Sequence, residues 1–273
     1  MINQTSFAMP KVGIHPVIDA RDIIPPYTPG ALRGGTHAHS WSPGGKWVSF
    51  TYNDVIIKNL ENSGVIGKQD LRMVDIMAPF GKVRVSPEEY GENIDGEMFT
   101  YILTQVHEKP VPGTDMIDRA YEEGWVGKHG YRKSDGSRQK HAIAFLGDRK
   151  YPGIQGPRHW VQSMPDGSFV FFMMRDDEGL VQIYGISPNG GEIRQFTFNS
   201  FSAETTFTVR PYGEYLAYGN QERVFITGIK TGVTHQISPD PAEGSKGLRY
   251  IVWSNDGNML AFNRKIDIEH IKV

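Results

Sequence analysis

The sequence contains no cysteine, which excludes disulfide frameworks, thiolate nucleophiles and cysteine-based zinc sites. It also lacks an apolar run near the roughly 18 residues of a membrane span, and residues 1–21 lack the basic start and apolar core of a signal peptide. The 29 basic and 31 acidic residues nearly cancel, with no block of one sign. We therefore expect no nucleic-acid partner and no membrane span. As written, the chain is expected to be soluble and cytoplasmic, or periplasmic if its N-terminus is truncated.

Motifs for organic cofactors are missing too. The glycine pairs Gly34-Gly35 and Gly190-Gly191 lack the strand-to-helix context that phosphate loops and dinucleotide folds require. No nucleophile elbow is present. We therefore expect no nucleotide and no organic cofactor.

Turn formers and aromatics, in contrast, are abundant: 31 Gly, 17 Pro, 14 Phe, 12 Tyr and 5 Trp. This composition favours many short strands joined by tight turns. One hairpin unit recurs four times, as W-S-P-G-G-K-W-V-S-F at 41–50, S-M-P-D-G-S-F-V-F-F at 163–172, V-R-P-Y-G-E-Y-L-A-Y at 209–218 and W-S-N-D-G-N-M-L-A-F at 253–262. Every copy has Gly at its fifth position, where a tight turn requires positive φ. The last three copies begin 46 and 44 residues apart, close to the length of a four-stranded propeller blade.

The repeat predicts an all-β fold, a single β-propeller over residues 1–273 with WD-like four-stranded blades. The expected blades are 36 to about 82, 85–155, 157–200, 203–243 and a last one from 247, preceded by an irregular segment over 1–35. Residues 107–140 read as an insertion, with a helix over Asp115–Glu123 capped by Thr114 and an exposed loop over Lys128–Lys140. About five blades are recognisable, and unpaired blade edges are expected to promote self-association.

Three segments resemble an uncharacterised bacterial family of TolB-like propellers that includes enterobacterial YidR: Pro26–His39, Arg119–Gly127 and Pro157–Trp160. Members of that family are longer. The resemblance therefore implies that this chain is an N-terminally truncated form of a six- or seven-bladed ring.

The segment His37-Ala-His39, followed by S-W-S-P-G-G, is more distantly similar to the H-P-H-x-x-F-x-P-D segment of oligogalacturonate lyases. That similarity implies a manganese ion held by three histidines and a glutamine at the channel mouth, and lyase action on acidic oligosaccharides. The glutamine of that pattern stands three residues before the first histidine, where this chain has Gly34. At this position the chain differs from the lyase pattern. The difference concerns the metal site and the substrate that the similarity implies.

The hairpin alignment predicts which residues surround the propeller axis. Four residues before each copy stand His37, His159, Thr205 and Arg249. His37 and His39, at i and i+2 of a strand, should share a face and reach one divalent ion, Mn, Zn or Fe, together with His159. Glu204 is expected to add an oxygen ligand or to orient a ring. The alternative is that these side chains line the channel and are solvated by water.

Two functions follow from this arrangement. In the first, a metal-bound uronate carboxylate acidifies the neighbouring C–H for β-elimination, with Arg158 and Arg249 as the catalytic candidates that bind the anion or accept the proton. In the second, the chain is a non-catalytic propeller that binds a peptide, protein or glycan, and Thr205, Trp125 and Trp160 contribute to the binding surface. The expected partner is a small acidic saccharide or a peptide or protein ligand.

Overall fold

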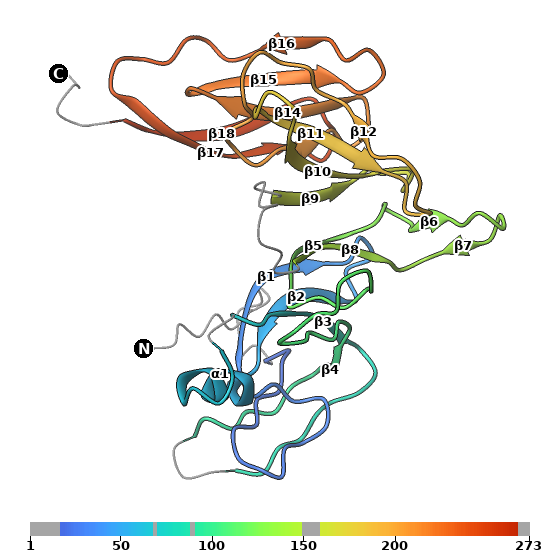
Figure 1. The fold of residues 1–273 in the computed structure, drawn as a ribbon, viewed down its shortest axis with the longest axis vertical. Helices are drawn as coiled ribbons and strands as arrows, with labels where there is room; N and C mark the ends of the chain where they lie inside the picture. The colour runs from blue at the N-terminus through green and yellow to red at the C-terminus, as the bar shows by residue number, and fades with distance from the viewer. Residues whose placement is uncertain (1–16, 68–69, 88–90, 149–158, 267–273) are drawn as a thin grey trace. The chain divides into compact units, whose positions relative to one another are not determined.

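The computed structural model describes residues 17–67, 70–87, 91–148 and 159–266, and these form an almost entirely β structure (Figure 1). Contacts divide the chain into two compact units, residues 1–123 with 145–153 and residues 124–144 with 154–273. Each unit is described by itself below. The single propeller domain and the count of five blades stay predictions.

The first unit is built on a four-stranded antiparallel sheet of order β1-β2-β3-β4 (Figure 1). Its strands are β1 (Gly35–Trp41), β2 (Val48–Asn53), β3 (Met73–Ala78) and β4 (Phe99–Ile102). Helix α1 (Val55–Asn62) follows β2, and its first turn is capped by Asp54, whose carboxylate accepts a hydrogen bond from the Ile56 N–H. In the described part of 1–35, residues 17–34 form isolated bridges only.

The fourth strand of this sheet corrects the predicted blade boundary. We expected the first blade to end near residue 82 and the next blade to span residues 85–155. Instead β4 pairs with β3, with Ile76 opposite Tyr101. The intervening segment returns to the sheet because Met98 joins the core of the first unit and bridges to Asp19.

The second unit contains two more four-stranded antiparallel sheets, each with its strands in sequence order. The first comprises β9 (His159–Ser163), β10 (Val170–Arg175), β11 (Val181–Ile186) and β12 (Arg194–Gln195). The next comprises β13 (Thr208–Val209), β14 (Tyr215–Asn220), β15 (Arg223–Gly228) and β16 (Thr234–Gln236). A final hairpin is formed by β17 (Ser245–Trp253) and β18 (Leu260–Ile266). All four predicted hairpins are therefore confirmed.

The glycines of the hairpin turns explain why the repeat keeps this residue. Gly45, Gly167, Gly213 and Gly257 have φ values of 64°, 76°, 78° and 66°. A residue with a Cβ adopts this left-handed backbone only at a cost in free energy. The sequence repeat is therefore a repeat of backbone geometry.

The insertion over 107–140 differs from its prediction. The expected helix over Asp115–Glu123 is wrong, because β5 (Arg119–Trp125) occupies this stretch and pairs with β8 (Ile143–Asp148). Thr114 closes a local turn by donating to the Val111 carbonyl at 2.7 Å. Within the predicted loop, β6 (Tyr131–Arg132) and β7 (Arg138–Gln139) form a short hairpin.

Candidate functional site

A β-bulge in β1 sets the directions of the two predicted ligand histidines. His37 is paired with Thr51 and Ser40 with Ser49, so Ala38 and His39 lie together opposite Phe50. Ala38 has φ +58°. His39 stacks on the Phe50 ring at a centroid distance of 5.8 Å, and its Nε2 lies 3.1 Å from Thr36 Oγ1. Thr51 and Phe50 point to opposite faces of β2, so the expected shared face of His37 and His39 is wrong.

The same bulge recurs in the second unit. Trp160 and Tyr250, which stand three residues before their hairpin copies as Ala38 does, have φ values of 64° and 54°. The strand register shifts at both places. The bulge is thus part of the repeat. Because it interrupts the alternation of side chains between the two faces of the strand, residues i and i+2 at the predicted axis positions do not share a face.

His39 lies in an electrostatic pair with Asp19. Burial lowers the pKa of His39, Asp19 acts to raise it, and His37 lowers it further. Burial also raises the pKa of Asp19, which the charge of His39 partly opposes. The pKa values of both groups are therefore shifted in the direction that favours the neutral form, as expected for partly buried ionisable side chains.

His37 faces a cluster of charges that the sequence analysis missed. Arg72 binds Asp70 through two hydrogen bonds, from Nε to Oδ1 at 3.1 Å and from Nη2 to Oδ2 at 2.6 Å. Arg119 Nη1 lies 3.9 Å from the same Oδ2. Burial lowers the pKa of His37, Arg72 lowers it further and Asp70 opposes this. We call Asp70, Arg72 and Arg119 the arginine site.

The local fold holds the arginine site together from three segments. The Ala120 N–H donates to the Arg72 carbonyl at 2.8 Å, which joins the start of β5 to the residue before β3. Leu71 is fixed to α1 because its N–H donates to Glu61 Oε1 at 3.2 Å. The side chains of Asp70, Arg72 and Arg119 are 41%, 33% and 28% exposed. They are ordered by contacts with the protein and still reach solvent.

Positive charge dominates at the arginine site. Burial acts to raise the pKa of Asp70, but hydrogen bonds from Arg72 and the charges of Arg72, Arg119 and Lys58 hold it below its ordinary value. Lys58 Nζ also lies 4.0 Å from Glu61. Lys58, Arg72 and Arg119 thus face two carboxylates, Asp70 and Glu61, and the cluster keeps an excess of positive charge.

A buried carboxyl group lies in the same sheet. Asp75 of β3 is 0% exposed, and neither of its oxygens has a hydrogen-bond partner within the part of the chain that the structure describes. Burial raises the pKa of Asp75 to about 7, and the charges of Asp54 and Glu123 act in the same direction. The nearby Leu103 N–H, which donates to the Val74 carbonyl at 3.2 Å, opposes the shift in part. The run M-V-D-I-M could have revealed this residue, since its flanking residues are apolar.

The remaining predicted site residues belong to the second unit or lie outside the described residues. Arg158 and the side chain of His159 are outside them. Glu204 Oε2 accepts from the Gln221 N–H and Thr205 Oγ1 accepts from the Gly219 N–H, each at 2.8 Å, so both support β14 and the turn after it. Arg249 is exposed on β17 opposite Asn263.

Within the described ranges, no three His, Cys, Asp or Glu side chains form a group that could hold a metal ion. Of the predicted aromatic contacts, Trp160 is 37% exposed. Trp125 lies edge-on to His141 at 6.4 Å, and its carbonyl accepts a hydrogen bond from Ser163 Oγ.

Comparison with known proteins gives two sequence relationships. Residues 8–92 match a family model described as "Protein of unknown function (DUF3748)". The chain is 35% identical over 305 residues to the "Uncharacterized protein YidR" of Escherichia coli (strain K12), with 90% of this chain and 68% of that protein covered.

Among solved structures, TolB from Acinetobacter baumannii is similar with a TM-score of 0.39 and 14% identity, over 86% of this chain and 55% of that one. A TolB-type structure from Agrobacterium tumefaciens gives a TM-score of 0.32 and 13% identity, over 85% and 58%. The chain therefore spans a little over half the length of these structures. No helix within the described residues is long and apolar enough to cross a membrane.

Proposed function

Because this chain belongs to the family of the Escherichia coli protein YidR, whose description assigns no activity, we propose a function from the arginine site itself. The chain acts as a binding protein that holds a carboxylate group of an acidic saccharide or peptide. The observation that supports this is the convergence of two guanidinium groups on one surface carboxylate, Asp70. The third cation of the cluster, Lys58, adds to the attraction for an anion.

Arginine suits this role because its planar guanidinium presents several donors that match a carboxylate. Arg72 directs Nε and Nη2 to Asp70, and its Nη1 takes no part in these two bonds. A charge-assisted hydrogen bond contributes about 1.5–3 kcal/mol when the group is screened from water. The arginine site is partly exposed, so one carboxylate is expected to bind weakly, and a ligand with several carboxylates should bind more tightly.

Titration calorimetry with trigalacturonate tests the proposal, with triglutamate as the peptide counterpart and the methyl-esterified trisaccharide as the neutral reference. Removal of a bidentate cation by Arg72→Ala should weaken binding of the acidic ligand by about tenfold, equivalent to 1.4 kcal/mol. Lys230→Ala, which removes an exposed cation from a turn of the second unit, serves as the matched control. Equal binding of the charged and esterified trisaccharides, or an unchanged Arg72→Ala variant, would refute carboxylate recognition here.

A divalent metal ion with lyase-like elimination on acidic oligosaccharides is the second candidate. The observation that favours it is that burial lowers the pKa of both His37 and His39. Neutral imidazole is the form that binds a metal ion. Because the two side chains lie on opposite faces of β1, they do not bind one ion together, and each would need other ligands to complete a site.

Elemental analysis of the purified protein tests this second candidate. A stoichiometric metal that is lost in His37→Ala or in His39→Ala is the expected result for the metal-bound form. His235→Ala, at an exposed histidine of β16, is the control. Metal content that is absent after incubation with excess Mn²⁺ or Zn²⁺, or that is unaffected by the first two substitutions, would contradict the candidate.

A further inference from the structure

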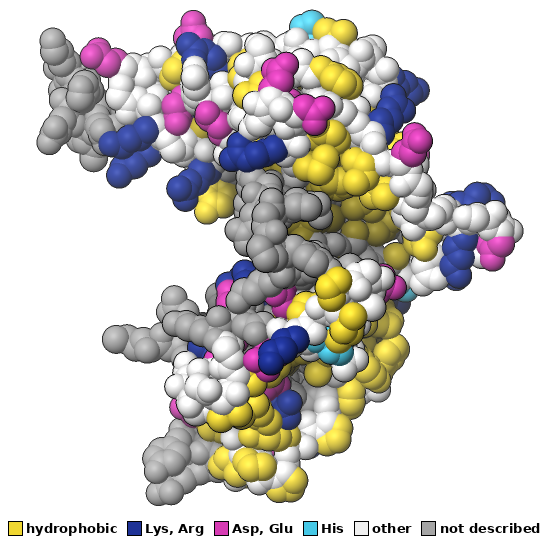
Figure 2. All heavy atoms as spheres, viewed as in Figure 1, with side chains coloured by type: hydrophobic (Ala, Val, Ile, Leu, Met, Phe, Trp, Pro, Cys, Tyr) yellow, Lys and Arg dark blue, Asp and Glu magenta, His cyan; other side chains and the backbone are white. Residues whose placement is uncertain are grey.

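The β6–β7 hairpin of the second unit concentrates positive charge. Residues 128–140 contain five basic side chains and a single acidic one, Asp135. The rest of the chain therefore has 24 basic and 30 acidic residues. Figure 2 shows Lys and Arg side chains, in dark blue, gathered on this hairpin. We call the following five exposed cations the basic hairpin: Lys128, Arg132, Lys133, Arg138 and Lys140.

Strand pairing brings together cations that are apart in the sequence. Arg132 and Arg138 are register partners in the antiparallel pair, so their side chains project from the same face. Like charges at directly opposite positions destabilise a hairpin. Each guanidinium is held by a backbone carbonyl, because Arg132 Nη1 donates to the Gly136 oxygen at 3.0 Å and Arg138 Nη1 donates to the His129 oxygen at 3.1 Å. These carbonyls orient the two charges and do not neutralise them.

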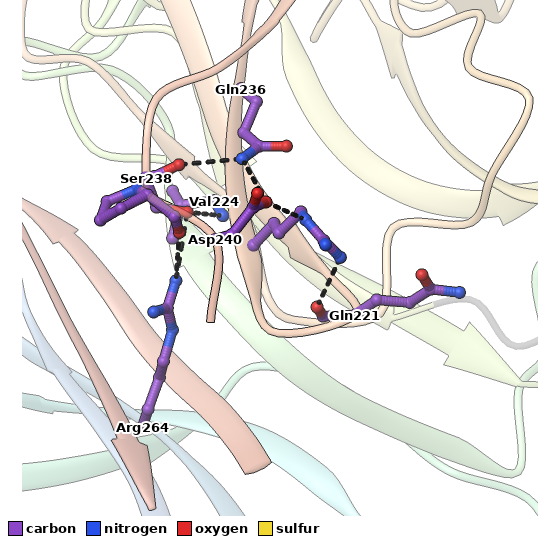
Figure 3. A network of polar contacts seen from close by, with 8 residues as sticks. Gln221, Val224, Gln236, Ser238, Asp240 and Arg264 are labelled. Atoms are coloured by element: carbon purple, nitrogen blue, oxygen red, sulfur yellow. Dashed lines mark hydrogen bonds and ion pairs between the residues drawn. The ribbon is translucent and has the colours of Figure 1, made fainter. Parts of the chain in front are cut away.

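The carboxylate within this hairpin is engaged in its turn. Asp135 Oδ1 accepts from Ser137 Oγ at 2.6 Å and from the Ser137 N–H at 2.8 Å, and these two bonds lower the pKa of Asp135. Among the described residues, none of the five cations of the basic hairpin forms an ion pair. By contrast, Arg223 in the same unit donates to Asp240 at 2.8 Å within a network of polar contacts (Figure 3). The described residues therefore leave the charge of the basic hairpin uncompensated.

The backbone of the hairpin is fixed to two turns of the sheet formed by β9 to β12. The Lys128 N–H donates to the carbonyl of Pro165, in the turn between β9 and β10, at 2.7 Å. Asn189 Nδ2, in the turn between β11 and β12, donates to the Arg132 carbonyl at 2.9 Å. Both contacts lie within the second unit. Because the backbone that carries the cations is already ordered, a ligand loses less conformational entropy when it binds them.

The small extent of the basic hairpin favours a short acidic peptide as its ligand. Nucleic acids and anionic membranes are extended polyanions that favour a broad basic surface, whereas the rest of this chain is net acidic. Carboxylates at alternate positions of an extended peptide lie about 7 Å apart on one face, so four of them span about 20 Å. One side of the hairpin, residues 128–133, covers no more than about 20 Å. The two lengths match.

We propose that the basic hairpin docks an acidic segment of a partner protein, in which several Asp or Glu side chains lie along an extended peptide. Arg132 and Arg138 offer planar guanidinium groups whose remaining N–H donors match a carboxylate. Exposed charge pairs are individually weak, so we expect a dissociation constant on the order of 0.1–1 mM. Such a contact acts mainly by raising the association rate and by orienting the partner. The arginine site lies in the first unit, so this proposal does not rest on the function proposed above.

Fluorescence anisotropy of labelled octaglutamate tests the docking. Wild type should bind the peptide at about 10 mM salt, and about tenfold more weakly at about 150 mM salt, because screening weakens exposed charge pairs. The triple variant Arg132→Gln, Lys133→Gln, Arg138→Gln removes three positive charges and should weaken binding at low salt by about tenfold. Lys133→Glu, at an exposed position beside the turn, is a second variant that should also weaken binding. Circular dichroism verifies that each variant is folded.

The control is a triple variant with the same loss of charge elsewhere in the second unit: Lys230→Gln, Lys246→Gln, Lys265→Gln. Lys246 and Lys265 are also register partners, so the control removes an opposed pair of cations as well. Its affinity for octaglutamate should stay within about twofold of wild type, because the removed charges lie outside the basic hairpin.

Three results would overturn the proposal. The first is a wild type that does not bind octaglutamate at low salt. The second is an equal loss of affinity in the control and hairpin variants, which would mean that net charge alone attracts the peptide. The third is tighter binding of phosphatidylglycerol vesicles or of a single-stranded oligonucleotide than of octaglutamate, which would identify another class of partner. An unaffected hairpin variant together with a weakened Arg72→Ala variant would remove this proposal and leave the arginine site in place.

Discussion

Replacement of Asp75 by asparagine is expected to stabilise the protein at pH 8 by on the order of 2 kcal/mol and to change stability little at pH 5. Asp75 is fully buried and, among the described residues, neither oxygen has a hydrogen-bond partner, so ionisation of its carboxyl group is costly. Its pKa in the folded protein is raised to about 7 from 3.8. A shift of this size corresponds to ~4 kcal/mol, and the unpartnered amide of asparagine offsets ~1–3 kcal/mol of the gain.

The direction of the pH dependence follows from proton binding. Between pH 3.8 and about 7, the folded protein holds a proton on Asp75 that the unfolded chain has released. The free energy of unfolding therefore falls as the pH rises through this window, and the loss is complete above the folded pKa. The Asp75→Asn variant has no such proton, so it lacks this component of the slope.

Denaturant unfolding of both proteins at pH 5 and pH 8 measures the effect. Asp54→Asn is the matched control, because Asp54 is also buried but binds Arg33 at 2.7 Å and caps α1. This control should lose stability at both pH values, since it breaks an ion pair and weakens a cap. If wild type and Asp75→Asn change in parallel between pH 5 and pH 8, Asp75 is not the titrating group.

Asp70→Asn is expected to bind trigalacturonate about tenfold more tightly than wild type, a gain of about 1.4 kcal/mol. Asp70 accepts both hydrogen bonds from Arg72 and neutralises charge that a ligand carboxylate would otherwise meet. The amide has nearly the same shape and removes the negative charge. The gain should shrink at high salt, because exposed charges are screened.

The control for this prediction is Asp240→Asn in the second unit. Asp240 forms a similar surface pair with Arg223 at 2.8 Å, so the variant makes the same change in net charge away from the arginine site. It should leave the affinity unchanged. An Asp70→Asn variant that binds with wild-type affinity, or more weakly, would mean that Asp70 does not compete with the ligand.

The hairpins could be predicted from the sequence because their turns require one residue type at one position, Gly at the fifth place of each copy. For the helix expected over Asp115–Glu123, the sequence contains no residue whose backbone requirement excludes a helix. The i, i+4 pairing of Arg119 with Glu123 is a weak local preference. In the structure Glu123 accepts a hydrogen bond from Thr51 at 2.9 Å and Ala120 bonds to Arg72, so tertiary contacts decide in favour of a strand.

The candidate site was predictable only in its location near His37. The bulge that separates His37 from His39 places the non-glycine residue Ala38 at positive φ, for which the sequence gives no signal. Arg72 and Arg119 stand outside the repeat and far apart in sequence, and they meet only because β5 starts beside the residue before β3. Sequence periodicity identifies residues that occupy equivalent positions in the repeated hairpins. It does not identify contacts between residues outside the repeat, such as Arg72 and Arg119.

A crystal structure of the protein with bound trigalacturonate tests carboxylate binding at the arginine site by direct observation. We expect a ligand carboxylate oxygen within about 2.7–2.9 Å of an Arg72 guanidinium nitrogen, the range of charge-assisted hydrogen bonds, with Arg119 beside it. A trisaccharide bound elsewhere, for example along the exposed rings of Phe80 and Tyr101, with the Arg72–Asp70 pair unchanged, would contradict carboxylate recognition by these arginines.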